Sequence, residues 1–220
     1  LTCPTAPATA EATSSSGAVV TYGTASASDD VDSDITISYS PASGSTFAIG
    51  TTQVTVTATD DYSNQTTCTF NVVVSDTASP AITCGAHNNT NIDTSGNGTN
   101  DATEATSASG AAVTWSASTA TDAGDDSVAI TYSTASGSTF AIGTHTITAT
   151  ATDDSSNTST CTFTVKVADT TNPAITCADD PASVEATSSA GAAVSWTEST
   201  QATATDDGDS SVAITYSPVS

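Results

Sequence analysis

Basic residues are almost absent from this chain. Lys166 is the only lysine or arginine among 220 residues, against 24 acidic residues, and the formal net charge at pH 7 is −23. Recognition of a phosphate backbone needs a basic surface, so this balance excludes nucleic acid as a partner and disfavours anionic membranes. The same charge attracts cations, and it makes compact folding costly at low salt unless ions screen the repulsion.

Methionine is also absent, and aromatic residues make up only 5% of the chain. Any core must therefore be thin, as in small β-sandwiches. No apolar run reaches the roughly 18 residues that a membrane-spanning helix needs, and no signal-peptide pattern is present, so we expect no direct membrane insertion in this segment. The sequence begins at Leu1 and stops at Ser220 inside a recurring pattern, which predicts an excerpt of a longer protein.

A block of residues recurs along the chain at a spacing of 93. The matching pairs include Tyr39 and Tyr132, Phe47 and Phe140, Cys68 and Cys161, and Asp76 and Asp169. A third copy begins at Pro173. We predict two complete repeats, residues 1–77 and 78–170, and a truncated third repeat, residues 171–220. The second repeat carries a polar loop insertion at about residues 86–100.

Within each copy, apolar residues alternate with polar residues, which is the period of a strand with one buried face. In residues 147–152, for example, apolar residues alternate with three threonines, whose stiff side chains suit an exposed pleated surface. Turn-forming clusters at residues 60–64 and 153–157 predict β-hairpins. No segment has helical periodicity. The pattern predicts an all-β fold made of tandem immunoglobulin-like β-sandwiches.

The repeat register also organises the five cysteines. It pairs Cys3 with Cys68 and Cys84 with Cys161, each joining the first strand of a copy to its last, and leaves the partner of Cys177 beyond the sequence. Paired cysteines indicate an oxidising compartment, hence a secreted or cell-surface protein. The alternative is reduced or zinc-bound thiols, which the absence of any CxxC spacing disfavours.

The ordered motifs resemble those of the hyalin repeat (HYR) family. They are Pro-x-Ile-x-Cys at 80–84, Gly-Ala-x-Val-x-Trp at 110–115, Gly-Ser-x-Phe-x-Ile-Gly-Thr at 137–144 and Cys-x-Phe-x-Val at 161–165. The resemblance implies an immunoglobulin-like fold in extracellular multi-repeat proteins linked to adhesion, with no catalytic residues. Two departures are Tyr22, which replaces the tryptophan of the other copies, and the insertion in the second repeat.

Aspartates recur in register in two loops and in the residue that precedes each linker proline by four positions. If these loops meet at one end of a sandwich, their carboxylates could bind Ca²⁺, which prefers oxygen ligands. The predicted ligands are Asp76, Asp122, Asp125, Asp153, Asp169 and Asp206. The alternative is that these residues form solvated turns. A second pattern, Asp93 to Glu104, resembles an EF-hand loop but has no flanking helices, and a flexible polar loop is its alternative.

Four sequons, at Asn64, Asn88, Asn97 and Asn157, predict N-glycosylation in a glycosylating host. His87 and His145 do not recur between repeats, so neither belongs to a repeated catalytic or metal-binding set, and we predict that the chain is not an enzyme. It requires no cofactor; Ca²⁺ is the one candidate ion.

The pattern favours a structural segment of a long stalk or filament, in contact with neighbouring repeats or copies of itself. The alternative is an adhesion module that binds extracellular glycans, matrix or a receptor through the insertion or the exposed threonine faces.

Overall fold

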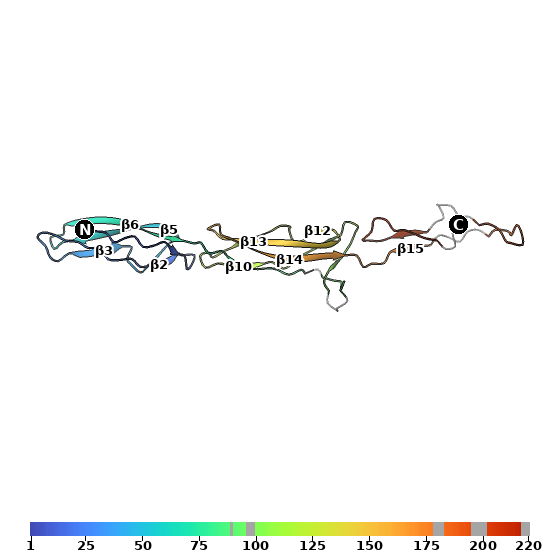
Figure 1. Ribbon diagram of the computed structural model, residues 1–220, viewed down its shortest axis with the longest axis horizontal. Coiled ribbons are helices and arrows are strands. Elements are labelled where there is room, and N and C mark those ends of the chain that lie inside the picture. The colour runs from blue at the N-terminus through green and yellow to red at the C-terminus, as the bar shows by residue number, and fades with distance from the viewer. Residues whose placement is uncertain (89, 96–99, 178–182, 195–201, 217–220) are drawn as a thin grey trace. The chain divides into compact units, whose positions relative to one another are not determined.

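The computed structural model describes residues 1–88, 90–95, 100–177, 183–194 and 202–216, and every regular element among them is a β-strand (Figure 1). The first repeat contains β1 (Ala10–Glu11), β2 (Ala18–Val20), β3 (Thr36–Ser40), β4 (Ser45–Phe47), β5 (Gly50–Thr59) and β6 (Gln65–Ser75). The second contains β7 (Ala81–Thr83), β8 (Thr103–Glu104), β9 (Ala111–Ala112), β10 (Thr119–Thr121), β11 (Ala129–Tyr132), β12 (Thr139–Phe140), β13 (Gly143–Thr152) and β14 (Thr158–Ala168). The third contributes β15 (Ala174–Thr176) and β16 (Thr203–Thr205).

The main four-stranded sheet has the same arrangement in the two complete repeats. In the first, a sheet with the order β1-β6-β5-β3 is accompanied by the pair β2-β4; in the second, the order is β8-β14-β13-β11, with the pairs β9-β12 and β7-β10. β5 and β6 pair antiparallel along their length, from Gly50 opposite Val74 to Thr59 opposite Gln65. The hairpin predicted at residues 60–64 is therefore confirmed. β15 and β16 pair as β7 and β10 do.

The core of the first repeat lies between its two layers. Val20 of β2 and Phe47 of β4 pack with apolar residues of β5 and β6, and the cluster comprises Ala12, Ala18, Val20, Phe47, Val54, Val56, Phe70, Val72 and Val74. These are the inward positions that the alternating pattern predicts. Thr148, Thr150 and Thr152 of β13 differ from the prediction, because they are half-buried rather than exposed, whereas Thr144 and Thr146 of the same strand are exposed. β13 is an inner strand with a neighbour on each side, which covers part of its outer face.

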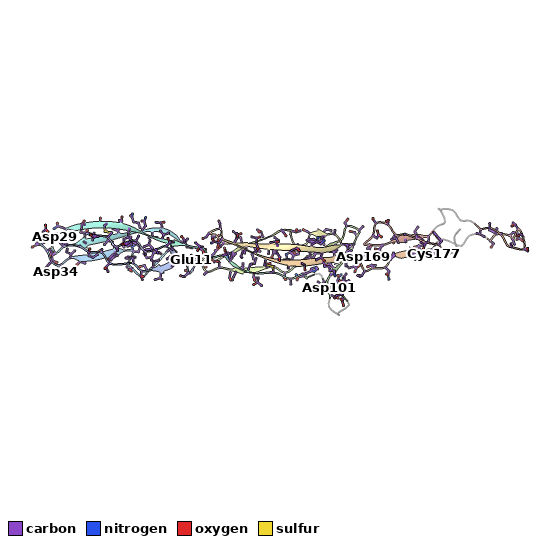
Figure 2. All side chains as sticks on the ribbon, in the orientation of Figure 1. Glu11, Asp29, Asp34, Asp101, Asp169 and Cys177 are labelled. Atoms are coloured by element: carbon purple, nitrogen blue, oxygen red, sulfur yellow. A yellow bond between two sulfur atoms is a disulfide. The ribbon has the colours of Figure 1, made fainter. Side chains whose placement is uncertain are left out.

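Both predicted disulfides are present, Cys3–Cys68 and Cys84–Cys161. They span the ends of the two repeats, and together with the sheet topology they confirm the all-β sandwich fold. Cys3 adjoins a single bridge, formed by Thr2 and Ser26, rather than a longer first strand. Cys177 is exposed and has no disulfide partner (Figure 2).

Contacts divide the chain into two compact units. The first consists of Leu1–Cys84, Ser118–Tyr132 and Ala149–Cys161, and the second of Gly85–Ala117, Ser133–Thr148 and Thr162–Ser220. The unit boundaries cut through β13 and β14. The domain boundaries at residues 77 and 170 stay a prediction.

Two glycines of the second repeat differ in how closely the surrounding backbone approaches them. Gly110 and Gly137 both have positive φ angles, 101° and 88°. A Cβ at Gly110 would lie 1.8 Å from the carbonyl oxygen of Phe140, whereas a Cβ at Gly137 meets nothing within 4 Å. Gly137→Ala is expected to cost about 1 kcal/mol through backbone strain alone. Gly110→Ala adds a backbone clash and is expected to cost at least ~1 kcal/mol more.

The free energy of unfolding of the two variants, from chemical denaturation, checks this prediction. Equal losses of unfolding free energy in the two variants would contradict the prediction, because they would show that the clash at Gly110 has no effect on stability.

Candidate metal centre

The first acidic loop follows β10. Asp122 accepts a hydrogen bond from the backbone N–H of Gly124 at 2.8 Å, which closes a tight turn. Asp125 has different partners. Its Oδ1 accepts a hydrogen bond from the N–H of Ser127 at 2.9 Å, and its Oδ2 accepts one from the N–H of Asp154 at 2.9 Å. Asp125 thus ties this loop to the hairpin turn after β13. Asp32 makes the equivalent bond to the N–H of Asp61 in the first repeat, at 2.7 Å.

The hairpin turn after β13 holds Asp153, which is buried. Its Oδ1 accepts from the backbone N–H of Asn157 at 2.7 Å, and its Oδ2 accepts from the side-chain Nδ2 of Asn157 at 2.9 Å. The same Nδ2 donates to the carbonyl oxygen of Asp76 at 3.2 Å. The turn therefore fixes the Asp153 carboxylate and also contacts the backbone of Asp76.

Asp76 follows the end of β6 and is only 7% exposed. Its Oδ1 accepts from the N–H of Ala78 at 3.3 Å, but its buried Oδ2 has no hydrogen-bond partner among the described residues. The neighbouring loop passes close to this carboxylate, since a Cβ at Gly124 would lie 2.5 Å from Oδ2. The conformation of that loop therefore depends on the absence of a side chain at Gly124.

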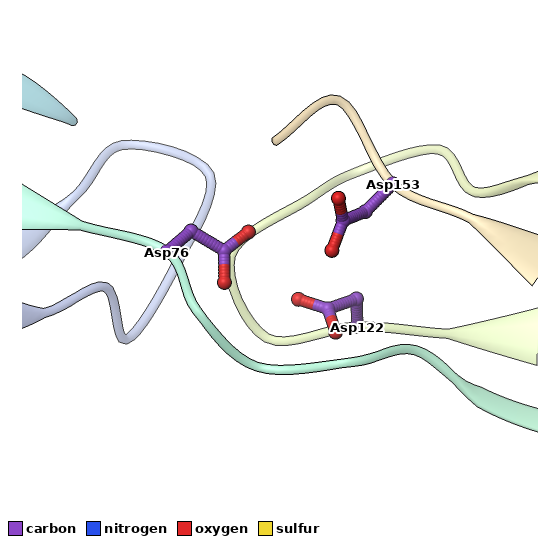
Figure 3. Close-up of side chains that lie close together, drawn as sticks. All are labelled: Asp76, Asp122 and Asp153. Atoms are coloured by element: carbon purple, nitrogen blue, oxygen red, sulfur yellow. The ribbon is translucent and has the colours of Figure 1, made fainter. Parts of the chain in front are cut away.

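Three of the predicted ligands come together. Asp76, Asp122 and Asp153 each offer one oxygen, and these atoms all lie within 4.8 Å of one another (Figure 3). All three residues belong to the first compact unit. Asp125 is not in this cluster.

The remaining predicted ligands, Asp169 and Asp206, lie in the second unit. They reproduce part of the arrangement: Asp206 accepts from the N–H of Gly208 at 2.8 Å, and a Cβ at Gly208 would lie 2.2 Å from Oδ2 of Asp169. Desolvation raises the pKa of Asp169, and the charge of Asp206 acts in the same direction. Asp169 is thus in register with Asp76 in structure as well as in sequence.

A repeated glutamate contact was not anticipated from the sequence. Glu11 accepts hydrogen bonds from the N–H and hydroxyl of Thr77 and from the N–H of Ala78, at 2.7, 2.7 and 3.1 Å. Glu104 makes the same contacts to Thr170 and Thr171. We call these two contacts the glutamate clasps. The available signal was the recurrence of Glu11, Glu104 and Glu185 in register, but nothing in the sequence indicated their distant partners.

The clasp of Glu104 predicts acid sensitivity. Hydrogen bonds from the hydroxyl and N–H of Thr170 lower the pKa of Glu104 below its ordinary value of 4.5. The unfolded chain therefore binds a proton at higher pH than the folded chain does, and the clasp's contribution to stability is lost as pH falls from about 4.5 through the lower folded pKa. Glu104→Gln is expected to lower the urea midpoint at pH 7 and to converge with the wild type once the pH falls below the lowered pKa of Glu104.

Urea denaturation at a series of pH values measures this convergence. Asp126→Asn removes the same charge from an exposed loop and controls for general electrostatics. A gap between Glu104→Gln and the wild type that stays constant with pH would contradict the prediction.

The described part of the insertion contacts the sandwich, and positions 96–99 of the EF-hand-like pattern lie outside the described residues. His87 pairs with Trp115 and Ile92 with Ala102 as single bridges, and Lys166 donates to Thr94. The Nζ of Lys166 lies 4.0 Å from Asp101, labelled in Figure 2. Glu104, the last position of the EF-hand-like pattern, is used in its clasp.

The sequons differ in their surroundings. Asn64 and Asn88 are exposed, whereas Asn157 is half-buried and uses its Nδ2 for two hydrogen bonds. Asn97 lies outside the described residues. Asn64 also donates its Nδ2, to Asp60 at 2.8 Å, so the two turn asparagines differ mainly in exposure. Glycosylation stays a prediction at all four positions.

The histidines lie apart from the cluster. The Nε2 of His145 contacts the carbonyl oxygen of Ala141 at 2.9 Å, and the Nε2 of His87 contacts the hydroxyl of Thr103 at 3.0 Å. Burial lowers the pKa of His87. In the described part of the chain, no helix is long and apolar enough to cross a membrane.

Comparison with known families gives two adjoining matches to the HYR domain, over residues 1–74 and 75–167. No curated protein matches the sequence. HYR domains are immunoglobulin-like, non-catalytic, extracellular repeat modules, and the two disulfides also indicate an extracellular location. The tandem sandwiches, their disulfides and these matches together show that the chain belongs to the HYR domain family.

Proposed function

We propose that this chain is a structural segment of an extracellular stalk or filament, in which HYR domains follow one another in a long array. The observation that carries the proposal is the glutamate clasp, which recurs in both complete repeats. Each clasp fastens the residues just after the last strand of a repeat, Thr77 or Thr170, to a short strand of that same repeat. A linker held in this way has less conformational freedom than a flexible linker, which is what a stiff stalk or filament requires.

Other features agree with a structural role. Each complete repeat has its own disulfide, which restricts the unfolded state of that repeat. The near absence of lysine and arginine leaves trypsin-like proteases almost nothing to cleave. An extracellular array benefits from both properties.

Small-angle X-ray scattering of the chain tests the proposal. One compact domain of this length has a radius of gyration of about 17 Å. A stiff array predicts a clearly larger value together with a rod-like cross-section. The double variant Glu11→Gln/Glu104→Gln is expected to broaden the distribution of interatomic distances, while Asp30→Asn/Asp126→Asn serves as the charge-matched control. A compact profile, or negative-stain images of globular monomers, would overturn the proposal.

An adhesion role is the second candidate, and one feature favours it. A hollow lined in part by the insertion carries the amide and hydroxyl groups of Asn88, Thr90 and Thr106 beside the apolar side chains of Ala111 and Ala112. Such groups suit the hydroxyls of a glycan. Deleting the whole insertion would also remove its bridges to Trp115 and Ala102, so point variants are the cleaner test. Asn88→Ala/Thr90→Ala should abolish glycan or cell binding in this case and leave the scattering profile unchanged.

A further inference from the structure

We propose that Asp76, Asp122 and Asp153 bind one calcium ion. Each residue offers one carboxylate oxygen, and the three oxygens lie within 4.8 Å of one another. Calcium binds oxygen at 2.3–2.6 Å, so two of its ligands are at most about 5 Å apart. An ion at the centre of three oxygens within this limit lies at most about 2.8 Å from each, so a small movement of the side chains brings all three within ligand distance. The three carboxylates point toward one another in Figure 3.

Burial supplies an independent reason for a ligand. Asp76 is 7% exposed and Asp153 is 5% exposed, and Oδ2 of Asp76 has no hydrogen-bond partner in the described part of the molecule. A buried carboxylate oxygen left without a partner is strongly unfavourable, and nearby like charges add to the cost. A bound cation would remove both penalties.

No ion pair involving the cluster is found in the described part of the chain. Lys166 is its only lysine or arginine, and it lies beside Asp101 and Thr94 in the second compact unit. The cluster belongs to the first unit, and both histidines contact other groups. The neutralising charge must therefore come from the solvent.

The chemistry of the ligands selects the ion. An all-carboxylate set suits a hard cation, whereas zinc prefers nitrogen and sulfur. Calcium accepts irregular geometry with water and carbonyl oxygens as its remaining ligands, while magnesium demands a near-ideal octahedron and gives up water reluctantly. We expect a dissociation constant of about 10⁻⁴ to 10⁻³ M for calcium, the range of extracellular modules, and at least about tenfold weaker binding of magnesium.

Part of the arrangement recurs in the third repeat. Asp169 and Asp206 correspond to Asp76 and Asp122, and Gly208 approaches Asp169 as Gly124 approaches Asp76. The counterpart of Asp153 would fall after Ser220. The close approach of a glycine to the carboxylate is thus a repeated feature of this loop, and it leaves room for the carboxylate to turn toward an ion.

The test is a CaCl₂ titration of the calcium-free chain, followed by NMR through the backbone amides of Gly124 and Asn157. In the wild type, these resonances are expected to shift with saturation in the stated range, and the melting temperature is expected to rise by about 5 °C at 10 mM calcium. Asp122→Asn should abolish the saturable shifts. Without calcium, the same variant should melt above the wild type, because one repelling charge is gone.

Two further variants sharpen the result. Gly124→Ala keeps all three carboxylates but places a methyl group against Asp76, and it is expected to weaken calcium binding at least tenfold. Asp126→Asn removes a charge from the same loop outside the cluster and should bind calcium as the wild type does. The proposal is overturned if calcium produces only unsaturable shifts spread over the exposed acidic loops, if Asp122→Asn binds normally, or if magnesium binds equally well.

Discussion

Replacing Cys84 and Cys161 together by alanine is expected to lower the free energy of unfolding of the second repeat by about 4.5 kcal/mol. The disulfide joins residues separated by 77 positions, and closing a loop of that length restricts the unfolded chain by about this amount in the loop-entropy model. Much of a small domain's stability, typically 5–15 kcal/mol, would be lost. Chemical denaturation with and without the double substitution measures the effect.

Cys177→Ala is the matched control, because Cys177 is exposed and forms no disulfide in this chain. It should leave the denaturation curve unchanged. A loss below about 1 kcal/mol for the double variant would contradict the expectation and would show that the sheets hold the repeat together without the cross-link.

The second large effect concerns the core of the first repeat. Phe47 is 2% exposed, packs edge-on against Tyr22 with ring centroids 6.4 Å apart, and belongs to the cluster between the two layers. Phe47→Ala is expected to cost about 3–5 kcal/mol, because a thin core cannot collapse to fill the cavity. Denaturation midpoints provide the measurement.

Ile49→Ala tests whether the loss comes from burial. Ile49 lies two residues further along the chain and is 39% exposed, so its truncation should cost less than about 1 kcal/mol. Similar midpoints for the two variants would contradict the assignment of Phe47 to the core.

Several features of the fold could be predicted because they depend on local or repeated patterns. Alternation in residues 147–151 identified the buried face of β13, since side chains in a strand point to opposite faces in turn. The repeat register, with the insertion of the second repeat taken into account, identified equivalent cysteines, and it was sufficient to pair Cys3 with Cys68. The half-burial of Thr148, Thr150 and Thr152 was not predicted, because the covering of these residues depends on strand order rather than on the strand itself.

The acidic loops, too, could be predicted only in part from the sequence. The repeat register placed Asp122 and Asp125 in one predicted ligand set, because the two residues lie three positions apart in the same recurring loop. The structure separates them: Asp122 faces Asp76 and Asp153, whereas Asp125 accepts the N–H of Asp154. The turn that each aspartate closes decides whether its carboxylate lies in the cluster. The composition of the loop does not predict that turn.

The sequence by itself determined the repeat, the sandwich, the cysteine pairs and the extracellular setting, because period, spacing and composition are local properties or recur in register. Only the tertiary structure decided the glutamate clasps and the membership of the aspartate cluster. Glu11 meets Thr77 across 66 positions of sequence, and Oδ2 of Asp76 loses contact with water only when distant loops fold over it. Burial and long-range hydrogen bonds arise when the whole chain is packed, so local pattern could identify these residues as recurrent but could not assign their partners.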